Sequence, residues 1–393
     1  MSVLDHINTL KPCQTTKREL HSLLNIFAFL HDCQFQRTNK NNHFNGVAMS
    51  RVQLTNPAEV PDLFRKQFKL CNVQEGETIV VLSDLGTRKE YVEAAFAAAN
   101  TFQANIYEMK VNAIPSWTSV GRETVGSCKG GVEALKAADL VLAMHVPLFT
   151  KWMHEVRASG TRVQMIIDHP DDLKSQMSTP AVKRATKAVT DRLAKSKSMR
   201  VTSSAGTDFQ AEIGDYPSLC QWGFADEPGH FDHWGAGHCY TFPNEGKANG
   251  TVVAQPGDIV VLPYNRYITD EIRITVEDGF IIKIEGGLDA RLMNHWLDSN
   301  KRSPDDRDGH AISHIGFGTN PYCRWDCIAL NGDDVDRSNG AVRGFAGNFL
   351  FSTGPNTQGG GTRITKGHYD LPMKDCTVYL DNELIIEDGA YVV

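Results

Sequence analysis

The sequence has no long apolar run and no cluster of basic residues. A membrane helix needs roughly 20 predominantly apolar residues, and no segment of the 393-residue chain approaches that length. The formal net charge is −7, and the 40 lysines and arginines are scattered along the chain. Because phosphate binding needs a concentrated basic face, this distribution argues against a nucleic-acid partner. We therefore expect neither a membrane nor a nucleic acid among the partners.

Cysteine patterns of stabilising sites are missing as well. The nine cysteines are an odd number, show no regular spacing and include no C-x-x-C pair, which argues against a disulfide framework and a structural zinc site. The first residues, MSVLDHINTLKPC, contain an acidic residue and lack the apolar core of a secretion signal. Together these features favour a reducing, cytoplasmic location.

Several common catalytic motifs are also absent. Neither G-x-G-x-x-G nor G-x-x-x-x-G-K-[ST] occurs, and the turn DLGT at 84–87 is best interpreted as a helix-capping turn. There is no G-x-S-x-G, no H-E-x-x-H and no evident order of Ser, His and Asp residues. A dinucleotide cofactor and covalent hydrolysis therefore have no support in the sequence.

The length indicates two domains, since single cores stop growing near ~250–300 residues. The hydrophobic fraction of 41% and the charged fraction of 22% are typical of a globular protein. Apolar residues at helical spacing predict an amphipathic helix at Thr16–His31, followed by a polar loop at 36–50 and a helix from Pro61 to Leu70. We assign residues 1–60 to an N-terminal helical extension.

Strands and helices alternate between residues 61 and 200. The predicted strands are Thr78–Leu82, Asn105–Met109, Asp139–Ala143 and Arg162–Ile167, and the predicted helices are Lys89–Phe102, Val132–Ala138, 150–158 and Pro180–Ser196. Because parallel strands are joined by helical crossovers, this order predicts an α/β domain with a parallel sheet covered on both faces.

The region 201–393 has a different character, with more glycine, proline and aromatic residues. Its predicted strands are short and alternating: Thr251–Val253, Asp258–Leu262, Ile272–Val276, Phe280–Ile284 and Thr377–Leu380. The pair Asp278-Gly279 is a hairpin turn signal, and Leu288–Asn300 is a predicted helix. This pattern predicts a β-rich α+β domain that is mostly antiparallel.

The run KGHYD at 366–370 is the most informative short motif. On an extended backbone, residues i and i+2 point to the same face, so His368 and Asp370 would present an imidazole and a carboxylate to one point. These are two of the three ligands of a 2-His-1-carboxylate triad, which holds Fe(II) and leaves positions open for substrate and O₂. A solvent-exposed pair on a loop is the alternative.

The missing histidine of such a triad should come from another segment. His314, in AISHIGFG at 311–318, has apolar neighbours and glycines that indicate a buried strand where backbone approaches a ligand. A hydrogen-bonded core histidine is the alternative. A second cluster, GFADEPGHFDHW at 223–234, contains His230 and His233, with His238 just beyond it. It is either a binding loop or a capping turn with surface charges.

Four longer runs resemble the 2,5-dihydroxypyridine 5,6-dioxygenase family, the Fe(II) ring-cleaving enzymes of nicotinate degradation. The runs are GDYPSLCQWGFADEPGHFDHW (214–234), AISHIGFG (311–318), GNFLFSTGPNT (347–357) and GHYDLP (367–372). With weaker similarity, the resemblance extends from about residue 65 to the C-terminus. It implies a homo-oligomer with a fold related to the thermophilic metallo-aminopeptidases, in which an N-terminal α/β domain and a C-terminal β-rich domain enclose the metal.

The resemblance also implies roles for individual residues. The iron ligands of the family carry over to His314, His368 and Asp370. The histidine of the D-H-W segment is His233, which becomes an acid/base or substrate-orienting group, and the serine of FSTGPN is Ser352, which becomes a substrate contact.

Two positions depart from the family pattern. Gln221 stands where the family has a glutamate, and an amide cannot take up a proton as a general base would. Phe149 stands where the family has a histidine in a lid-like segment, although His145, four residues earlier, could replace it. Both changes concern groups around the substrate, so the metal and O₂ chemistry is expected to be kept while the recognised ring substituents can differ.

The leading hypothesis is an Fe(II)-dependent dioxygenase that opens the ring of a hydroxylated pyridine or similar N-heteroaromatic substrate with O₂. In the family, 2,5-dihydroxypyridine gives N-formylmaleamate. An alternative is a metal-dependent aminopeptidase or amidohydrolase of the related fold. That chemistry usually needs two metals bridged by carboxylates, and the acids near 227, 285 and 289 form no evident ligand pattern. A metal-stabilised binding protein without enzymatic activity is a third possibility.

Overall fold

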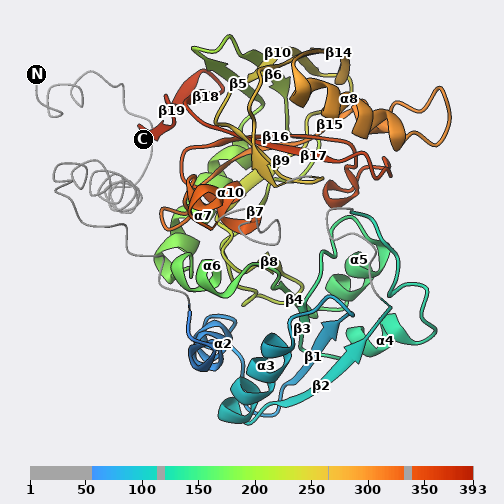
Figure 1. Ribbon diagram of the computed structural model, residues 1–393, viewed down its shortest axis with the longest axis vertical. Helices are drawn as coiled ribbons and strands as arrows, with labels where there is room; N and C mark the ends of the chain where they lie inside the picture. Colours follow the sequence, from blue (N-terminus) through green and yellow to red (C-terminus); the bar gives the residue numbers. More distant parts are fainter. Residues whose placement is uncertain (1–54, 113–119, 264, 332–338, 393) are drawn as a thin grey trace, which may run out of the picture.

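The computed structural model describes residues 55–112, 120–263, 265–331 and 339–392. The predicted helix Thr16–His31 and the polar loop 36–50 lie outside these residues. Figure 1 shows an α/β layer at the lower end of the molecule and β-rich layers at the upper end. In the described part of the chain, no helix combines the length and the apolar character that crossing a membrane requires.

A five-stranded parallel sheet forms the centre of the α/β layer. Its strands are β1 (Thr78–Ser83), β2 (Asn105–Lys110), β3 (Leu140–Ala143), β4 (Arg162–Met165) and β8 (Phe231–His233), in the order β2-β1-β3-β4-β8. Every neighbouring pair is parallel, as the alternating pattern predicts. The first four strands agree with the predicted ones within two residues. The fifth, β8, comes from beyond residue 200 and lies within the run at 223–234, where the sequence predicts a loop.

Helices cover both faces of this sheet. They are α2 (Val60–Leu70), α3 (Lys89–Phe102), α4 (Gly131–Lys136), α5 (Lys151–Ala158), α6 (Pro170–Ser175) and α7 (Pro180–Lys195). Along β1, Ile79 and Val81 pack with the apolar faces of α2 and α3, while Val80 and Leu82 pack with α4 and α5. Strands buried on both faces read as continuous apolar runs, which is why TIVVL predicts this arrangement.

The β-rich part contains two antiparallel sheets. The eight-stranded sheet has the order β14-β13-β10-β6-β5-β18-β19-β20, and the five-stranded sheet has the order β17-β16-β15-β9-β7. The strands of the larger sheet are β5 (Ser198–Ser203), β6 (Asp208–Glu212), β10 (Ala248–Ala254), β13 (Ile272–Glu277), β14 (Phe280–Gly286), β18 (Cys376–Leu380), β19 (Glu383–Glu387) and β20 (Ala390–Tyr391). Those of the smaller sheet are β7 (Leu219–Gln221), β9 (His238–Thr241), β15 (Ile312–Gly318), β16 (Phe349–Thr353) and β17 (Tyr369–Met373).

The remaining elements are short or lie at the edges. They are the ladder β11 (Ile259–Val260) with β12 (Arg266–Tyr267), and the helices α8 (Leu288–Ser299), α9 (Cys327–Asn331) and α10 (Asn339–Gly344). The predicted strand Asp258–Leu262 is shortened to β11. Val261 instead forms an isolated antiparallel bridge to Asp370, which joins this segment to β17.

The main core lies between the two antiparallel sheets. Phe209 and Ile274 of the large sheet share it with Ile315, Phe351 and Leu371 of the small sheet. Because side chains alternate along a strand, the neighbours of these core residues point to the opposite face of the small sheet. That opposite face faces the α/β layer, and it carries the predicted metal ligands.

Gly316 tests how tightly the strands of the small sheet are packed. A Cβ atom there would lie 2.0 Å from the carbonyl oxygen of Cys239 and 2.7 Å from the Cα of Tyr240 on β9. We expect Gly316→Ala to lower the free energy of unfolding by about 3 kcal/mol or more, because backbone cannot move aside as a flexible side chain can. Urea unfolding measures the change. Gly309→Ala is the control, since its Cβ would meet only contacts of 3.6 Å or more, and an equal loss in both variants would contradict the expectation.

Candidate metal centre

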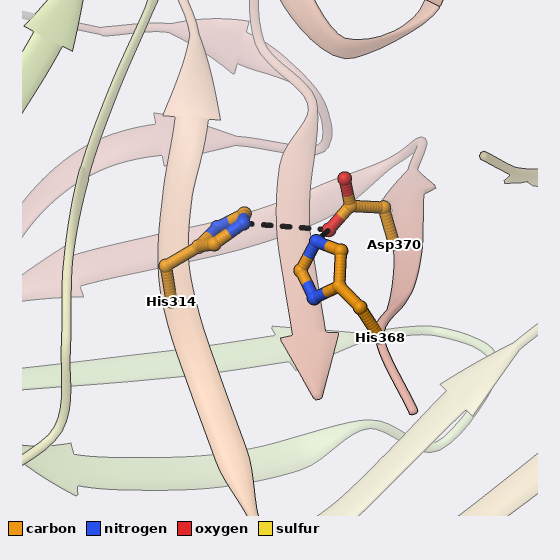
Figure 2. A group of neighbouring side chains, drawn as sticks. All are labelled: His314, His368 and Asp370. Carbon is orange, nitrogen blue, oxygen red and sulfur yellow. Dashed lines mark ion pairs between the residues drawn. The ribbon is translucent and has the colours of Figure 1, made fainter. Parts of the chain in front are cut away.

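Three buried side chains converge on one point at the edge of the small sheet. His314 lies on β15, Asp370 lies on β17, and His368 precedes β17 directly. The Nε2 atoms of His368 and His314 lie 3.3 Å and 3.4 Å from Oδ1 of Asp370. One ligand atom from each residue lies within 4.8 Å of the other two. Figure 2 shows the three side chains pointing toward one another from two different strands.

Backbone contacts set the tautomer of His368. Its Nδ1 lies 2.7 Å from the carbonyl oxygen of Thr353, and a carbonyl oxygen can only accept a hydrogen bond. The proton of the ring is therefore on Nδ1, and the lone pair of Nε2 faces Asp370. A hydrogen bond from one ring nitrogen to a carbonyl is the usual way to orient a metal-binding histidine. The main chain at His368 is held in turn by Nε1 of Trp296, which donates to its carbonyl oxygen at 3.0 Å.

Ser352 holds the strand position of His314. The pairing between β15 and β16 shifts register between Ile312 and Ile315, so the backbone of His314 leaves the regular ladder. The buried hydroxyl of Ser352 fills this gap. It accepts a hydrogen bond from the His314 N–H at 2.9 Å and donates one to the His314 carbonyl at 2.8 Å. Its hydrogen atom is thus used by the backbone, and a substrate contact by Ser352 stays a prediction.

The electrostatic state of His314 and Asp370 suits a cation. Burial lowers the pKa of His314 to about 3, with Asp370 acting in the opposite direction, so its imidazole is neutral. Burial alone would raise the pKa of Asp370, but His368, His314 and Arg343 hold it below its usual range. Neutral imidazoles and an ionised carboxylate are the forms that bind metals.

Unpaired polar atoms provide the test of whether a metal fits here. Within the described residues, Nε2 of His368 and both carboxylate oxygens of Asp370 are buried without a hydrogen-bond partner. A buried carboxylate in that condition is costly unless a cation compensates it. Two histidines and one carboxylate on one side of a point are the donor set of a non-haem Fe(II) site. The residues present therefore fit an iron ion.

The loop after β3 packs directly on this group. The ring of Phe149 meets the ring of His368 edge to face, with centroids 5.0 Å apart. Phe149 has a φ of +59°, a conformation that a bulky residue adopts rarely and only when its surroundings impose it. His145 instead lies beside Trp152 of α5, and burial lowers its pKa to about 4, against the charge of Asp84. Of the two residues predicted for the lid, Phe149 is the one that contacts a predicted metal ligand.

His233 lies at the end of β8, within a chain of buried charged groups. Its Nε2 is 3.0 Å from Oδ2 of Asp168, which follows β4, and its Nδ1 is 3.3 Å from the NH2 group of Arg343 on α10. The NH1 group of Arg343 is 3.6 Å from Oδ2 of Asp370. The structure thus connects His233 through Arg343 to Asp370, a predicted metal ligand.

Gln221 and His238 form a cross-strand pair on β7 and β9. His238 is buried, and burial together with the charge of Arg343 holds its pKa well below the usual range. Its ring stacks on Tyr240, and the ring of Tyr240 lies 5.0 Å from that of His314. The face of the small sheet thus extends from the metal ligands to His238, and Gln221 lies opposite His238 in the register.

A buried carboxylate supports the segment that carries Gln221 and His233. Asp232 accepts hydrogen bonds from the backbone N–H groups of Trp222, Gly223 and His233 at 2.7–2.8 Å. His230 stacks flat on Trp222 and lies 2.8 Å from Asp232. In the run ADEPGHFDHW, His230 and Asp232 therefore support the local backbone and position His233.

Sequence reasoning missed Arg343 and Asp168. Arg343 lies in the segment AVRGFAG, where nothing in the local spacing marks a polar site. A signal did exist for Asp168, because it follows a parallel strand and ligands bind beyond the carboxyl ends of such strands.

Comparison with known proteins agrees with this geometry. A family model described as 2,5-dihydroxypyridine 5,6-dioxygenase matches residues 59–393. The chain belongs to this family. A curated relative, 2,5-dihydroxypyridine 5,6-dioxygenase of Pseudomonas putida, is 35% identical over 346 residues, which cover 85% of this chain and 96% of the relative. The resemblance seen in the four sequence runs is confirmed.

Solved structures agree at the level of the fold. The structure of 2,5-dihydroxypyridine dioxygenase from Pseudomonas putida KT2440 matches with a TM-score of 0.81 and 34% identity, over 86% of this chain and 98% of that one. Wild-type AmpT from Thermus thermophilus matches with a TM-score of 0.56 and 11% identity, over 86% and 99%. The expected fold class, an α/β part with a parallel sheet plus a β-rich part in a metallo-aminopeptidase-like architecture, is confirmed.

Ser352→Ala tests the support of His314. We expect the loss of about 2 kcal/mol of unfolding free energy, because the N–H of His314 becomes a buried donor without a partner. We also expect weaker metal binding, by about tenfold or more, because His314 loses its fixed position. Urea unfolding and titration of the metal-free protein with Fe(II) under anaerobic conditions measure the two effects. An unchanged affinity for Fe(II) would show that the strand backbone at the register shift orients His314 without Ser352.

Proposed function

We propose that this protein is a non-haem Fe(II)-dependent dioxygenase that opens the ring of a hydroxylated pyridine. The proposed substrate is 2,5-dihydroxypyridine or a close analogue, and the proposed product is of the N-formylmaleamate type. Family membership supports the ring-opening dioxygenase class. The observation that carries the metal dependence is the buried group of His314, His368 and Asp370, in which neither carboxylate oxygen has a hydrogen-bond partner.

The proposed metal ligands are His314, His368 and Asp370. Bound Fe(II) would supply the redox chemistry that lets O₂ react with an electron-rich ring. The protein's part is to present three ligands from one side, so that the remaining positions stay available. The hydrogen bond of His368 to Thr353 and the two hydrogen bonds of Ser352 to His314 hold two of these ligands in place before any metal binds.

Aromatic side chains form the proposed ring-binding surface. Phe149 packs on His368, while Tyr240 and Phe242 lie 5.0 Å and 6.1 Å from His314 by ring centroid. Such surfaces exclude water and favour a flat heterocycle. The positive charge of Arg343 favours a ring whose hydroxyl has lost its proton. Gln221 offers an amide where the family has a glutamate, so it can bind a ring substituent but cannot remove a proton from it.

The hydrolase alternative requires a second metal. Among the described residues, the only cluster of three metal-ligating side chains is the one already named. Glu227 pairs with Lys183 and Lys187, and Glu285 pairs with Lys283. Asp289 accepts hydrogen bonds from the backbone N–H groups of residues 269 and 270. The acids considered for a two-metal site are thus engaged in other contacts, which favours the oxygenase.

Assembly, location and domain division complete the proposal. The family resemblance implies a homo-oligomer, and the free thiols of the seven described cysteines are consistent with the expected cytoplasmic location. We keep the division into 1–60, 61–200 and 201–393, with β8 as a strand that the third segment adds to the sheet of the second.

His368→Ala tests the metal ligand. We expect the variant to fold, to bind no stoichiometric iron and to consume no O₂ with 2,5-dihydroxypyridine, because two ligands hold Fe(II) too weakly. Iron analysis, an oxygen electrode and circular dichroism measure the three properties. His295→Ala, an exposed histidine on α8, is the control and should behave like the wild type. Full activity of His368→Ala would rule out the site.

Metal content and product mass test the reaction class. We expect one iron per chain, and two oxygen atoms from ¹⁸O₂ in the product of a hydroxylated pyridine. A panel of dihydroxy- and trihydroxypyridines, followed by mass spectrometry, identifies the preferred ring. Two zinc or cobalt ions per chain with hydrolysis of an amide substrate would instead support the aminopeptidase or amidohydrolase.

A further inference from the structure

Arg343 links the metal ligands to the α/β layer through buried contacts. Its side chain is 8% exposed, and its guanidinium lies between Oδ2 of Asp370 at 3.6 Å and Nδ1 of His233 at 3.3 Å. His233 then reaches Oδ2 of Asp168 at 3.0 Å. His233 and Asp168 are fully buried. Residues from three segments far apart in the sequence thus form a chain of contacts that ends at Asp370, a proposed metal ligand.

The donor chemistry fixes the direction of these contacts. A guanidinium has only donors, so Nδ1 of His233 is the acceptor toward Arg343. The ring proton is therefore on Nε2, which faces the carboxylate of Asp168. Both nitrogens of His233 therefore lie beside protein groups, Nδ1 beside Arg343 and Nε2 beside Asp168.

The two oxygens of Asp370 have different surroundings. Oδ1 lies 3.3–3.4 Å from the Nε2 atoms of His368 and His314, at the point where the metal would bind. Oδ2 lies on the side of Arg343. Carboxylates bind metals through one oxygen or through both. If both oxygens bound, one of the positions left open for substrate and O₂ would be lost.

We propose that Asp168, His233 and Arg343 form a positioning relay that keeps Asp370 a one-oxygen metal ligand. The relay rests on the proposed function. Arg343 competes with the metal for Oδ2, and His233 with Asp168 holds the guanidinium in place. An arginine suits this task because its planar fork contacts two partners at once, which the single ammonium of a lysine does not do.

The test uses Mn(II) alone as a probe, with the metal-free protein. Water-proton relaxation reports how many exchanging water molecules the bound Mn(II) carries. In Arg343→Met, Oδ2 becomes available, and we expect about one of three waters to be displaced. We also expect Mn(II) to bind about tenfold more tightly, because a nearby positive charge is removed. A merely structural role of Arg343 predicts weaker binding instead.

Further variants test the relay itself. His233→Phe keeps a ring but removes both nitrogens. We expect bound Mn(II) to lose water in this variant too, but less than in Arg343→Met. Because the two residues act in one chain, the double variant should resemble Arg343→Met, without an additive effect. Arg162→Met is the control, since Arg162 is also buried and pairs with Glu77 at 2.7 Å, but lies in the α/β layer. Arg162→Met should leave both the number of waters on bound Mn(II) and the affinity for Mn(II) unchanged.

The outcomes separate the relay from the proposed function. An unchanged water number in folded Arg343→Met, or weaker Mn(II) binding, would overturn the relay. If Arg343→Met does not fold, the same two measurements on His233→Phe decide: an unchanged water number or weaker Mn(II) binding would overturn the relay. A wild-type protein that binds neither Mn(II) nor Fe(II) would overturn the proposed metal site instead.

Discussion

The two-residue alternation of the small antiparallel sheet is the constraint on which the site depends. One face of β15, β16 and β17 packs Ile315, Phe351 and Leu371 into the apolar core, and the other face presents His314 and Asp370. A slip of one residue in any of these strands would exchange the two faces. The same packing that stabilises the fold therefore orients the side chains of the proposed ligands. The register shift between β15 and β16, with its hydrogen bond to Ser352, sets the orientation of His314.

The α/β layer contributes the other half of the site. Phe149 follows β3, Asp168 follows β4 and His233 ends β8, so all three come from the carboxyl ends of parallel strands. Ligand sites in open α/β sheets form at this edge, where loops leave the sheet. Here the edge meets the polar face of the small sheet, where Phe149 contacts His368 and Arg343 lies between Asp370 and His233.

Phe149 and Gln221, the two positions at which the resemblance implies departures from the family pattern, are not among the proposed metal ligands. Phe149 places an apolar ring on His368, and Gln221 is an amide that lies opposite His238 in the register. Neither side chain can take up a proton. The charge that remains nearest to Asp370 is the fixed positive charge of Arg343, which burial and pairing with His233 hold in place.

Local patterns in the sequence determined the local structure. The helix Lys89–Phe102 and the buried strand β1 follow from apolar spacing, and the i, i+2 spacing of His368 and Asp370 places both on one face. Tertiary structure alone decided which distant segments meet. Packing between segments far apart in the chain brings β8 into the parallel sheet. It also brings Phe149, and not His145, against His368, and Arg343 against Asp370. Short-range periodicity carries no information about such contacts, because it reports only which face of its own element a residue occupies.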